Sequence, residues 1–390
     1  MALEDLFLDK MSAQAMKEKM MGEVTGMLGV MLLNLGKETG VWQAMRGGAS
    51  VTTAKLAETA GLSERYLEEL LRASSLHGYL KYTPGTTPES KSWDSGIAVM
   101  GDSFALSPEM EEVLFDEDSP NYYGHSLSLP MFFAGAPFEK LIQSFKDDSG
   151  VPYALYGKKF PDFIEKDHSK IYQTQIKEWL KNEDLKDLRS VLSKGGVVLD
   201  LGCGNGWSSI SIAEEFPNTT VHAVDCDETS MEKANLNFAE AVSGKRVKAN
   251  QIIPHCCFAH EANIPKGSVD LVMLFICLHD MYNPSEVLAS AVDMLKPDGC
   301  ILVLEFTNPD SFPDLMSSDS PQKGLTKFCM SVSVLHCLPV YKVGPVGTPS
   351  QAVGTCFSLN TMKKVAAKGG FNSVTSFAAN EMMSLFVIKK

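Results

Sequence analysis

Apolar residues follow two different periods along this chain, and the change of period divides it. Residues 11–45 carry apolar side chains at three- and four-residue intervals, which predicts a helix with one apolar stripe. Further on, short apolar runs alternate with amphipathic segments such as 207–216 and 284–295. Buried strands that alternate with helices predict a doubly wound, parallel α/β sheet. The predicted strands are 197–201, 220–225, 269–276, 300–306 and 383–389.

The stripe of the first helix is rich in methionine. A methionine stripe at helical spacing is more typical of a core or of an interface between two copies of a chain than of a groove for varied partners. We therefore expect the chain to form a homodimer through this region. The members of the stripe are Met16, Met20, Met27, Leu28, Met31, Leu32 and Leu35.

The next segment has the pattern of a winged helix. A short helix, a turn at Gly61 and a second helix from Ser63 to about Leu76 predict a helix-turn-helix, and residues 103–106 are the candidate second strand of its wing. A DNA reader would carry basic and amide side chains on the second helix. This helix balances acidic against basic residues, so we expect no nucleic-acid partner. The charged residues are Glu64, Arg65, Glu68, Glu69 and Arg72.

These patterns divide the chain into three parts. Residues 1–112 form an all-helical and winged-helix domain, which is expected to serve in dimerisation and as a lid over the substrate. Residues 113–190 form a helical linker rich in aromatic side chains, a few of which are expected to line a pocket. Residues 191–390 form the α/β domain, with an insertion at about 308–356 that is long enough for a second lid.

Composition narrows the function classes. The net charge of −13 opposes binding to phosphate backbones and to anionic membrane surfaces. The nine cysteines contain no C-x-x-C pair, which favours reduced thiols and a cytoplasmic protein. No segment reaches the roughly 18 uninterrupted apolar residues of a membrane span. We expect neither a membrane partner nor a metal.

The first predicted strand runs into a glycine turn. Gly202, Gly204 and Gly206 are spaced by one residue each, and Trp207 stands where a dinucleotide-binding motif would need its last glycine. Asp200, just before the turn, would repel phosphate but attract a cationic group. Asp225, at the end of the second strand, is placed to accept the hydroxyls of a ribose. The predicted ligand therefore carries a ribose and a cation.

Residues 195–390 resemble the class I S-adenosylmethionine-dependent methyltransferases. The three glycines match that family's first motif, Asp225 matches its ribose acid, and residues 295–306 match its fifth-strand motif. The resemblance implies S-adenosylmethionine as the cofactor and a Rossmann-like sheet. His260 and Glu261 are the two candidates for the adenine contact.

A closer resemblance covers nearly the whole chain. The winged-helix segment and residues 152–163, 277–284 and 333–355 are similar to winged-helix-containing methyltransferases, which are known mainly from bacteria and have eukaryotic relatives. This resemblance implies the class of activity and leaves the substrate open. An aromatic linker and an apolar insertion favour a small, largely apolar acceptor that is methylated on oxygen.

His279 is the candidate general base. It follows the fourth strand, and the sequence Leu278-His279-Asp280 also resembles the plant phenolic O-methyltransferases, which carry a catalytic His-Asp pair at this point. Adjacent residues in an extended chain point in opposite directions, so Asp280 is not expected to orient His279. In the structural alternative, His279 donates to a loop carbonyl and Asp280 caps a turn.

His336, followed by Cys337, lies in the insertion and is a further candidate for the catalytic site. A metal site made of His279, Asp280 and His336 is a minority alternative, because no ligand spacing supports it. A second class of function also stays open. In it, the chain is a regulator that senses S-adenosylmethionine and uses its winged helix to bind DNA or a protein.

Overall fold

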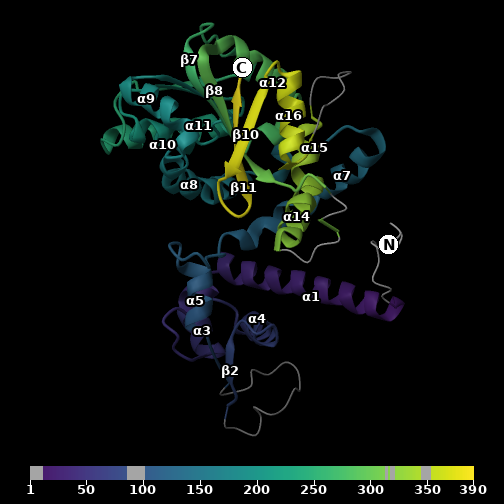
Figure 1. The fold of residues 1–390 in the computed structure, drawn as a ribbon. Helices are drawn as coiled ribbons and strands as arrows, with labels where there is room; N and C mark the ends of the chain where they lie inside the picture. The colour runs from purple at the N-terminus through teal and green to yellow at the C-terminus, as the bar shows by residue number, and fades with distance from the viewer. Residues whose placement is uncertain (1–11, 86–101, 312–314, 317–320, 344–352) are drawn as a thin grey trace. The chain divides into compact units, whose positions relative to one another are not determined.

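The structure is a computed structural model, shown in Figure 1. It describes residues 12–85, 102–311, 315–316, 321–343 and 353–390. The described residues divide into two compact units, one that ends at Met131 and one that begins at Phe132. Among the described helices, none combines the length and the apolar composition that crossing a bilayer requires.

The first unit contains the predicted winged helix. Its three strands pair antiparallel in the order β1-β3-β2, and α3 and α4 flank the turn at Gly61, where φ is 66°. The prediction of a helix-turn-helix with a second wing strand is therefore confirmed. The elements are α1 (Ala13–Glu38), α2 (Val41–Ala44), β1 (Val51–Thr52), α3 (Thr53–Ala60), α4 (Glu64–Leu76), β2 (Lys81–Thr83), β3 (Ser103–Ala105), α5 (Pro108–Phe115) and α6 (Leu129–Phe132).

The helix expected over residues 11–45 is two helices. Gly40 adopts the left-handed conformation with φ 77° and separates α1 from α2. This turn brings Trp42 against α1, where its ring nitrogen donates to the Leu33 carbonyl at 2.7 Å. A Cβ on Gly36 would come within 2.1 Å of the Trp42 ring, so the helix needs glycine there.

The methionine stripe of α1 faces solvent within the described chain. Met20 is 59% exposed and Leu28 is 52% exposed, whereas Leu33 on another side of the helix is buried. Most of the stripe therefore lies outside the core of its own unit, and Leu32 is the member that packs, partly buried, against that core. Met16, Met27, Met31 and Leu35 are exposed as well.

The second unit alternates strands and helices from β4 onward. The predicted insertion at 308–356 is described in part and contains α14, a π-helical turn (Ser333–Cys337) and α15. The elements are α7 (Ala136–Asp147), α8 (Phe160–Trp179), α9 (Lys186–Lys194), β4 (Val197–Leu201), α10 (Trp207–Glu215), β5 (Thr220–Asp225), α11 (Glu228–Ser243), β6 (Ile252–Cys256), β7 (Val269–Phe275), α12 (Pro284–Met294), β8 (Leu295–Thr307), α14 (Pro321–Val332), α15 (Leu338–Tyr341), β9 (Cys356–Phe357), α16 (Leu359–Lys368), β10 (Ser373–Ala378) and β11 (Met383–Lys389).

The main sheet confirms the predicted Rossmann-like fold, with one departure from a parallel sheet. Its order is β10-β11-β8-β7-β4-β5-β6, with β9 paired to β8. The pairs β4–β5, β4–β7, β5–β6 and β7–β8 are parallel, but β11 runs antiparallel to both β8 and β10. Only four residues connect β10 to β11, and a connection that short joins antiparallel strands, whereas parallel neighbours need a long crossover.

Two apolar layers cover the sheet, one on each face. Successive residues of β7 enter opposite layers: Leu271 and Met273 pack with α8, α10 and α11, while Val272 and Leu274 pack with α12 and α16. All seven residues of β7 are buried. Figure 1 shows α12 and α16 on one face of the sheet and α9, α10 and α11 on the other.

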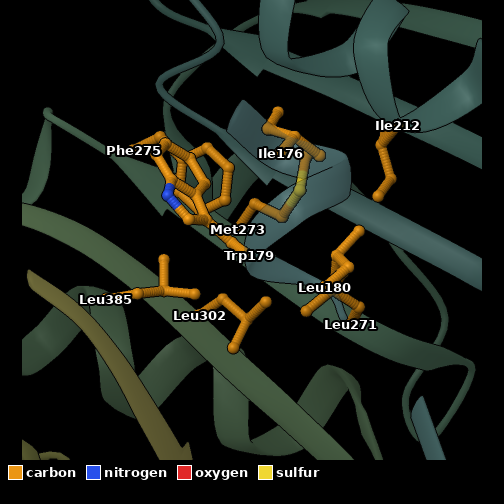
Figure 2. Close-up of a pocket in the computed structure, with 9 residues that line it drawn as sticks. All are labelled: Ile176, Trp179, Leu180, Ile212, Leu271, Met273, Phe275, Leu302 and Leu385. Carbon is orange, nitrogen blue, oxygen red and sulfur yellow. The ribbon is translucent and has the colours of Figure 1, made fainter. Parts of the chain in front are cut away.

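Helix α8 packs closely on the sheet. A void of about 10 Å³ lies between them, which is near the lower limit for one water molecule. Figure 2 shows the apolar side chains that line it. A void with only apolar walls offers a water no hydrogen bond, so this is core packing and not a ligand site. The lining residues are Ile176, Trp179, Leu180, Ile212, Leu271, Met273, Phe275, Leu302 and Leu385.

Truncation of Ile176 tests this packing. Ile176 is 2% exposed, and Ile176→Ala should lower the free energy of unfolding by about 2–5 kcal/mol, since it removes buried methyl groups and enlarges the void. Chemical denaturation measures the change. Leu236→Ala, at a side chain that is 71% exposed, is the control and should stay within about 0.5 kcal/mol. Equal effects of the two substitutions would contradict the assigned packing.

Candidate active site

The candidate site lies beyond the carboxyl ends of β4, β5 and β7. From β4 the chain goes on to β5 on one side, whereas β7 pairs on the other side, so the strand order reverses between β4 and β7. Ligands of doubly wound sheets bind at such a reversal. The Cys277 thiol donates to the Leu201 carbonyl at 3.1 Å and ties the ends of the two strands together.

The glycine turn after β4 has left-handed backbone at all three glycines. A Cβ on Gly202 would come within 2.8 Å of the Cys277 sulfur, and a Cβ on Gly206 would come within 2.3 Å of the Phe238 ring. Gly204, with φ 52°, has no neighbouring atom within 4 Å of its Cβ position. Two glycines therefore allow close packing, and the third leaves backbone open to a ligand.

Asp225 supports this turn from the end of β5. Its Oδ2 accepts from the Gly204 amide at 2.8 Å, and its Oδ1 accepts from the Asp227 amide at 2.9 Å. The carboxylate is thus held beside the open glycine, where each oxygen keeps a further lone pair. This position fits the expected role of binding ribose hydroxyls.

Asp200 is more buried than expected for a residue that attracts a cationic ligand. Its Oδ2 accepts from the hydroxyls of Ser208 and Ser209, both at 2.6 Å, and its Oδ1 has no hydrogen-bond partner among the described residues. The side chain is only 1% exposed. Burial raises the pKa of Asp200 to about 6, although the two hydroxyls oppose the shift. Asp200 therefore joins the glycine turn to the start of α10.

The two candidates for the adenine contact lie on the 3₁₀ turn Ala259–Glu261. The Glu261 carboxylate accepts from the Phe258 amide at 3.2 Å and so caps its own turn. The side chain of His260 lies outside the described residues. The adenine contact stays a prediction for both residues.

His279 is buried in the 3₁₀ turn Leu278–Asp280 after β7 and is bound to Glu305 of β8. The Glu305 carboxylate accepts from the His279 amide at 3.1 Å and faces ring Nδ1 at 2.6 Å. Burial lowers the pKa of His279, but the charges of Asp280 and Glu305 outweigh that effect and raise it well above its ordinary value. The sequence offered no signal for Glu305, because it lies 26 residues away within an apolar strand.

The expectation that Asp280 points away from His279 is wrong. The Asp280 carboxylate oxygen Oδ1 lies 3.3 Å from His279 Nε2. The two residues occupy a 3₁₀ turn rather than an extended strand, so their side chains do not alternate. Asp280 is therefore part of the same cluster as His279.

His336 lies in an aromatic cluster next to this pair. The ring centroids of Tyr156 and Phe160 are 4.5 and 4.6 Å from that of His336, and those of Tyr153 and Phe133 are 6.0 and 6.3 Å away. Burial lowers the pKa of His336 to about 4, so the imidazole is neutral near pH 7. Its Nε2 has no hydrogen-bond partner among the described residues.

Tyr153 is a half-buried member of the aromatic segment. Burial raises the pKa of Tyr153, and the charges of Asp280, Asp227 and Asp225 raise it further. The phenol therefore experiences the charges of carboxylates that follow both β5 and β7. Sequence reasoning found the aromatic segment but did not single out Tyr153.

Two family models match this sequence. Residues 198–299 match a model described as "Methyltransferase domain", and residues 26–89 match one described as "Rv2258c-like winged HTH domain". These matches confirm the resemblance on which the sequence predictions were based.

Curated relatives match the chain over a limited length. The malonyl-[acyl-carrier protein] O-methyltransferase of Halalkalibacterium halodurans is 27% identical over 143 residues, which are 35% of this chain and 46% of that protein. The tRNA 5-carboxymethoxyuridine methyltransferase of Escherichia coli K12 is 31% identical over 159 residues, which are 40% of this chain and 58% of that protein. The chain thus spans about half the length of these two relatives.

Solved structures match over nearly the whole chain at low identity. The mitomycin 7-O-methyltransferase MmcR has a TM-score of 0.65 at 17% identity, over 97% of this chain and 99% of that chain. Human N-acetylserotonin methyltransferase, in complex with SAM, has a TM-score of 0.60 at 16% identity, over 98% and 99%. An O-methyltransferase family protein of Burkholderia thailandensis has a TM-score of 0.63 at 17% identity, over 97% and 98%. These likenesses show a shared fold.

The raised pKa of Asp200 predicts a pH-dependent stability. Between the unfolded pKa of about 3.9 and the folded pKa of about 6, the folded state holds a proton that the unfolded state has lost. The free energy of unfolding should therefore fall as pH rises through this window, by up to about 3 kcal/mol. Asp200→Asn removes the titrating group and should flatten this part of the profile.

Denaturant unfolding between pH 4 and pH 7 measures the slope. Asp298→Asn is the control for the loss of one carboxylate, because Asp298 is exposed. A slope that is the same in the Asp200→Asn variant and in the wild type would mean that the carboxyl does not change its protonation on folding.

Proposed function

We propose that this chain, which combines a winged helix-turn-helix domain with a class I methyltransferase domain, transfers a methyl group from S-adenosylmethionine to a small molecule, on oxygen. The observation that carries the proposal is that Asp225 and the open Gly204 lie at the same edge of the sheet as the His279–Asp280 pair. That edge thus has one half suited to an adenosyl cofactor and one suited to a polar acceptor.

The glycine half of the site fits the cofactor. Asp225 would accept the ribose hydroxyls, and the backbone at Gly204 would allow the amino-acid part of the cofactor to approach closely. Asp200 keeps the turn in place from below. When bound, S-adenosylmethionine supplies an electrophilic methyl group.

The other half fits an acceptor. Methyl transfer needs the acceptor atom in line with the methyl group, so the main task of the protein is to orient the acceptor and to exclude water. Aromatic rings around His336 supply apolar walls, and the His279 and Asp280 side chains supply polar atoms. Oxygen as the attacked atom is supported by the similar solved structures, which include a mitomycin 7-O-methyltransferase.

The regulator alternative has less support. On α4, Arg65 forms ion pairs with Glu68 and Glu69, and Arg72 forms ion pairs with Glu68 at 3.3 Å and Asp102 at 3.4 Å. Arginines that are already paired with carboxylates add little to phosphate binding. We therefore propose no nucleic-acid partner.

We also propose that the chain forms a homodimer and that it is located in the reducing cytoplasm. The exposed methionine stripe of α1 supports pairing of two chains, because a contiguous apolar surface tends to be covered by a partner. No disulfide joins the cysteines whose side chains the structure describes, which supports a compartment that keeps thiols reduced.

Incubation with radiolabelled S-adenosylmethionine and a metabolite extract tests the activity. The wild type should transfer label to a small molecule. Asp225→Asn keeps one acceptor oxygen for the glycine turn but weakens the contact with the ribose, so it should weaken cofactor binding by roughly 2–3 kcal/mol in calorimetry. Asp298→Asn is the matched surface control. Unchanged affinity in Asp225→Asn would reject the ribose assignment, and no labelled product from any extract would reject the proposed transfer.

The dimer has its own test. The double substitution Met20→Glu and Met27→Glu places charges on the exposed stripe and should convert a dimer into a monomer in sedimentation velocity. Leu236→Glu, on α11, is the control for an added surface charge. A wild type that sediments as a monomer at micromolar concentration would disprove the pairing.

A further inference from the structure

Three side chains of types that bind transition metals converge in the acceptor half of the site. Ligand atoms of His279, Asp280 and Cys337 all lie within 4.8 Å of one another. The first two residues lie on the 3₁₀ turn after β7, and Cys337 lies on the π-helical turn Ser333–Cys337. One nitrogen, one oxygen and one sulfur donor are a set that suits Zn²⁺.

The spacing of His279 and Asp280 suits two ligands of one metal ion. His279 Nε2 and Asp280 Oδ1 are 3.3 Å apart, yet Oδ1 accepts no hydrogen bond from any described group. Two ligands about 2.0–2.1 Å from one tetrahedral zinc ion are roughly 3.3–3.4 Å apart. The distance between the two atoms is therefore compatible with ligation of one ion.

Glu305 completes the pattern from the other side of the imidazole. Its carboxylate faces His279 Nδ1 at 2.6 Å and is fully buried. A carboxylate on one ring nitrogen fixes the ring and leaves the other nitrogen for the metal, which is the usual arrangement of zinc-bound histidine. The pair is therefore already oriented for ligation through Nε2.

The backbone around the cluster is unusual in both segments. Ile276, three residues before His279, has φ 53°, which is strained for a β-branched side chain. The other segment is a π-helical turn, and π-helical turns occur frequently at functional sites. The fold thus holds both segments in strained or rare conformations where the three donors meet.

We propose that His279, Asp280 and Cys337 bind a zinc ion, with Glu305 orienting His279 and with the fourth position open. His336, the third ligand of the alternative considered from sequence, lies outside the group of atoms within 4.8 Å. On binding, the Cys337 thiol and His279 Nε2 release their protons to solvent, and bonds to zinc replace them. We further propose that an acceptor oxygen occupies the open position, and this part of the proposal depends on the proposed function.

Cobalt substitution tests the site without any methyl acceptor. The full-length protein is stripped with a chelator, dialysed and titrated with Co²⁺, and Zn²⁺ is then added as a competitor. One equivalent of Co²⁺ should produce a thiolate-to-cobalt charge-transfer band together with the visible absorption of a tetrahedral ion, and one equivalent of Zn²⁺ should abolish both.

Four variants assign the ligands. Cys337→Ser should remove the charge-transfer band, and His279→Gln and Asp280→Asn should each weaken binding and change the visible spectrum. Glu305→Gln should keep the band but weaken Zn²⁺ binding by roughly 10- to 100-fold. The thermal stability of each variant is measured in parallel. A loss of Zn²⁺ affinity at unchanged stability would show that Glu305 does more than support the fold.

Two control variants test whether Co²⁺ binds at another place in the protein. Cys300→Ala removes a thiol that is buried in the sheet and should leave the spectrum unchanged. His255→Gln disrupts the half-buried pair of His222 and His255, whose ring nitrogens are 3.0 Å apart, and should also have no effect. No stoichiometric Co²⁺, a band that survives Cys337→Ser, or a band lost in His255→Gln would each overturn the proposal. Calorimetry with S-adenosylmethionine is run separately, so a failure of the proposed function is seen independently.

Discussion

Burial of both faces of the central strands is the constraint on which the rest of the structure depends. β7 is buried along its whole length between two apolar layers, and β4 is buried at all but its first residue. Polar groups are costly to bury on either face, so most of them gather where the strands end. The glycine turn, Asp225 and His279 all lie at these ends.

Because of the same constraint, burial of a carboxylate in these strands lowers the stability of the fold unless hydrogen-bond donors surround it. Asp200 and Glu305 lie within or at the end of buried strands, and each has local hydrogen-bond donors: two serine hydroxyls for Asp200, and the amide and ring of His279 for Glu305. A buried carboxylate with fewer donors than lone pairs destabilises the fold. Both are tolerated beside the site, where the polar groups that they hold in place are needed.

Sequence patterns predicted the strands that are buried on both faces and missed those at the sheet edges. β6 and β10 were not predicted, because most of their residues are exposed or half-buried and no continuous apolar run marks them. The winged helix, the glycine turn and the position of Asp225 followed from local patterns of glycines, caps and strand ends. Each of these features has a signal that lies within a short stretch of the sequence.

The acceptor half of the site was harder to predict because it is assembled from distant segments. Glu305 and Cys337 reach His279 only through the pairing of β7 with β8 and through the packing of the insertion. The side-chain direction of Asp280 was wrong because an extended chain was assumed where a 3₁₀ turn exists. No spacing rule in one sequence distinguishes these two backbones.

The place of β11 in the sheet has a consequence for how the protein folds during synthesis. β11 lies between β8 and β10, so residues 383–389 separate two strands that precede them in the chain. Until these residues leave the ribosome, β8 presents an unpaired apolar edge, which is a template for aggregation. The nascent chain should therefore depend on chaperones until β11 has emerged, and truncations within β11 should be degraded rather than accumulate as a partly folded domain.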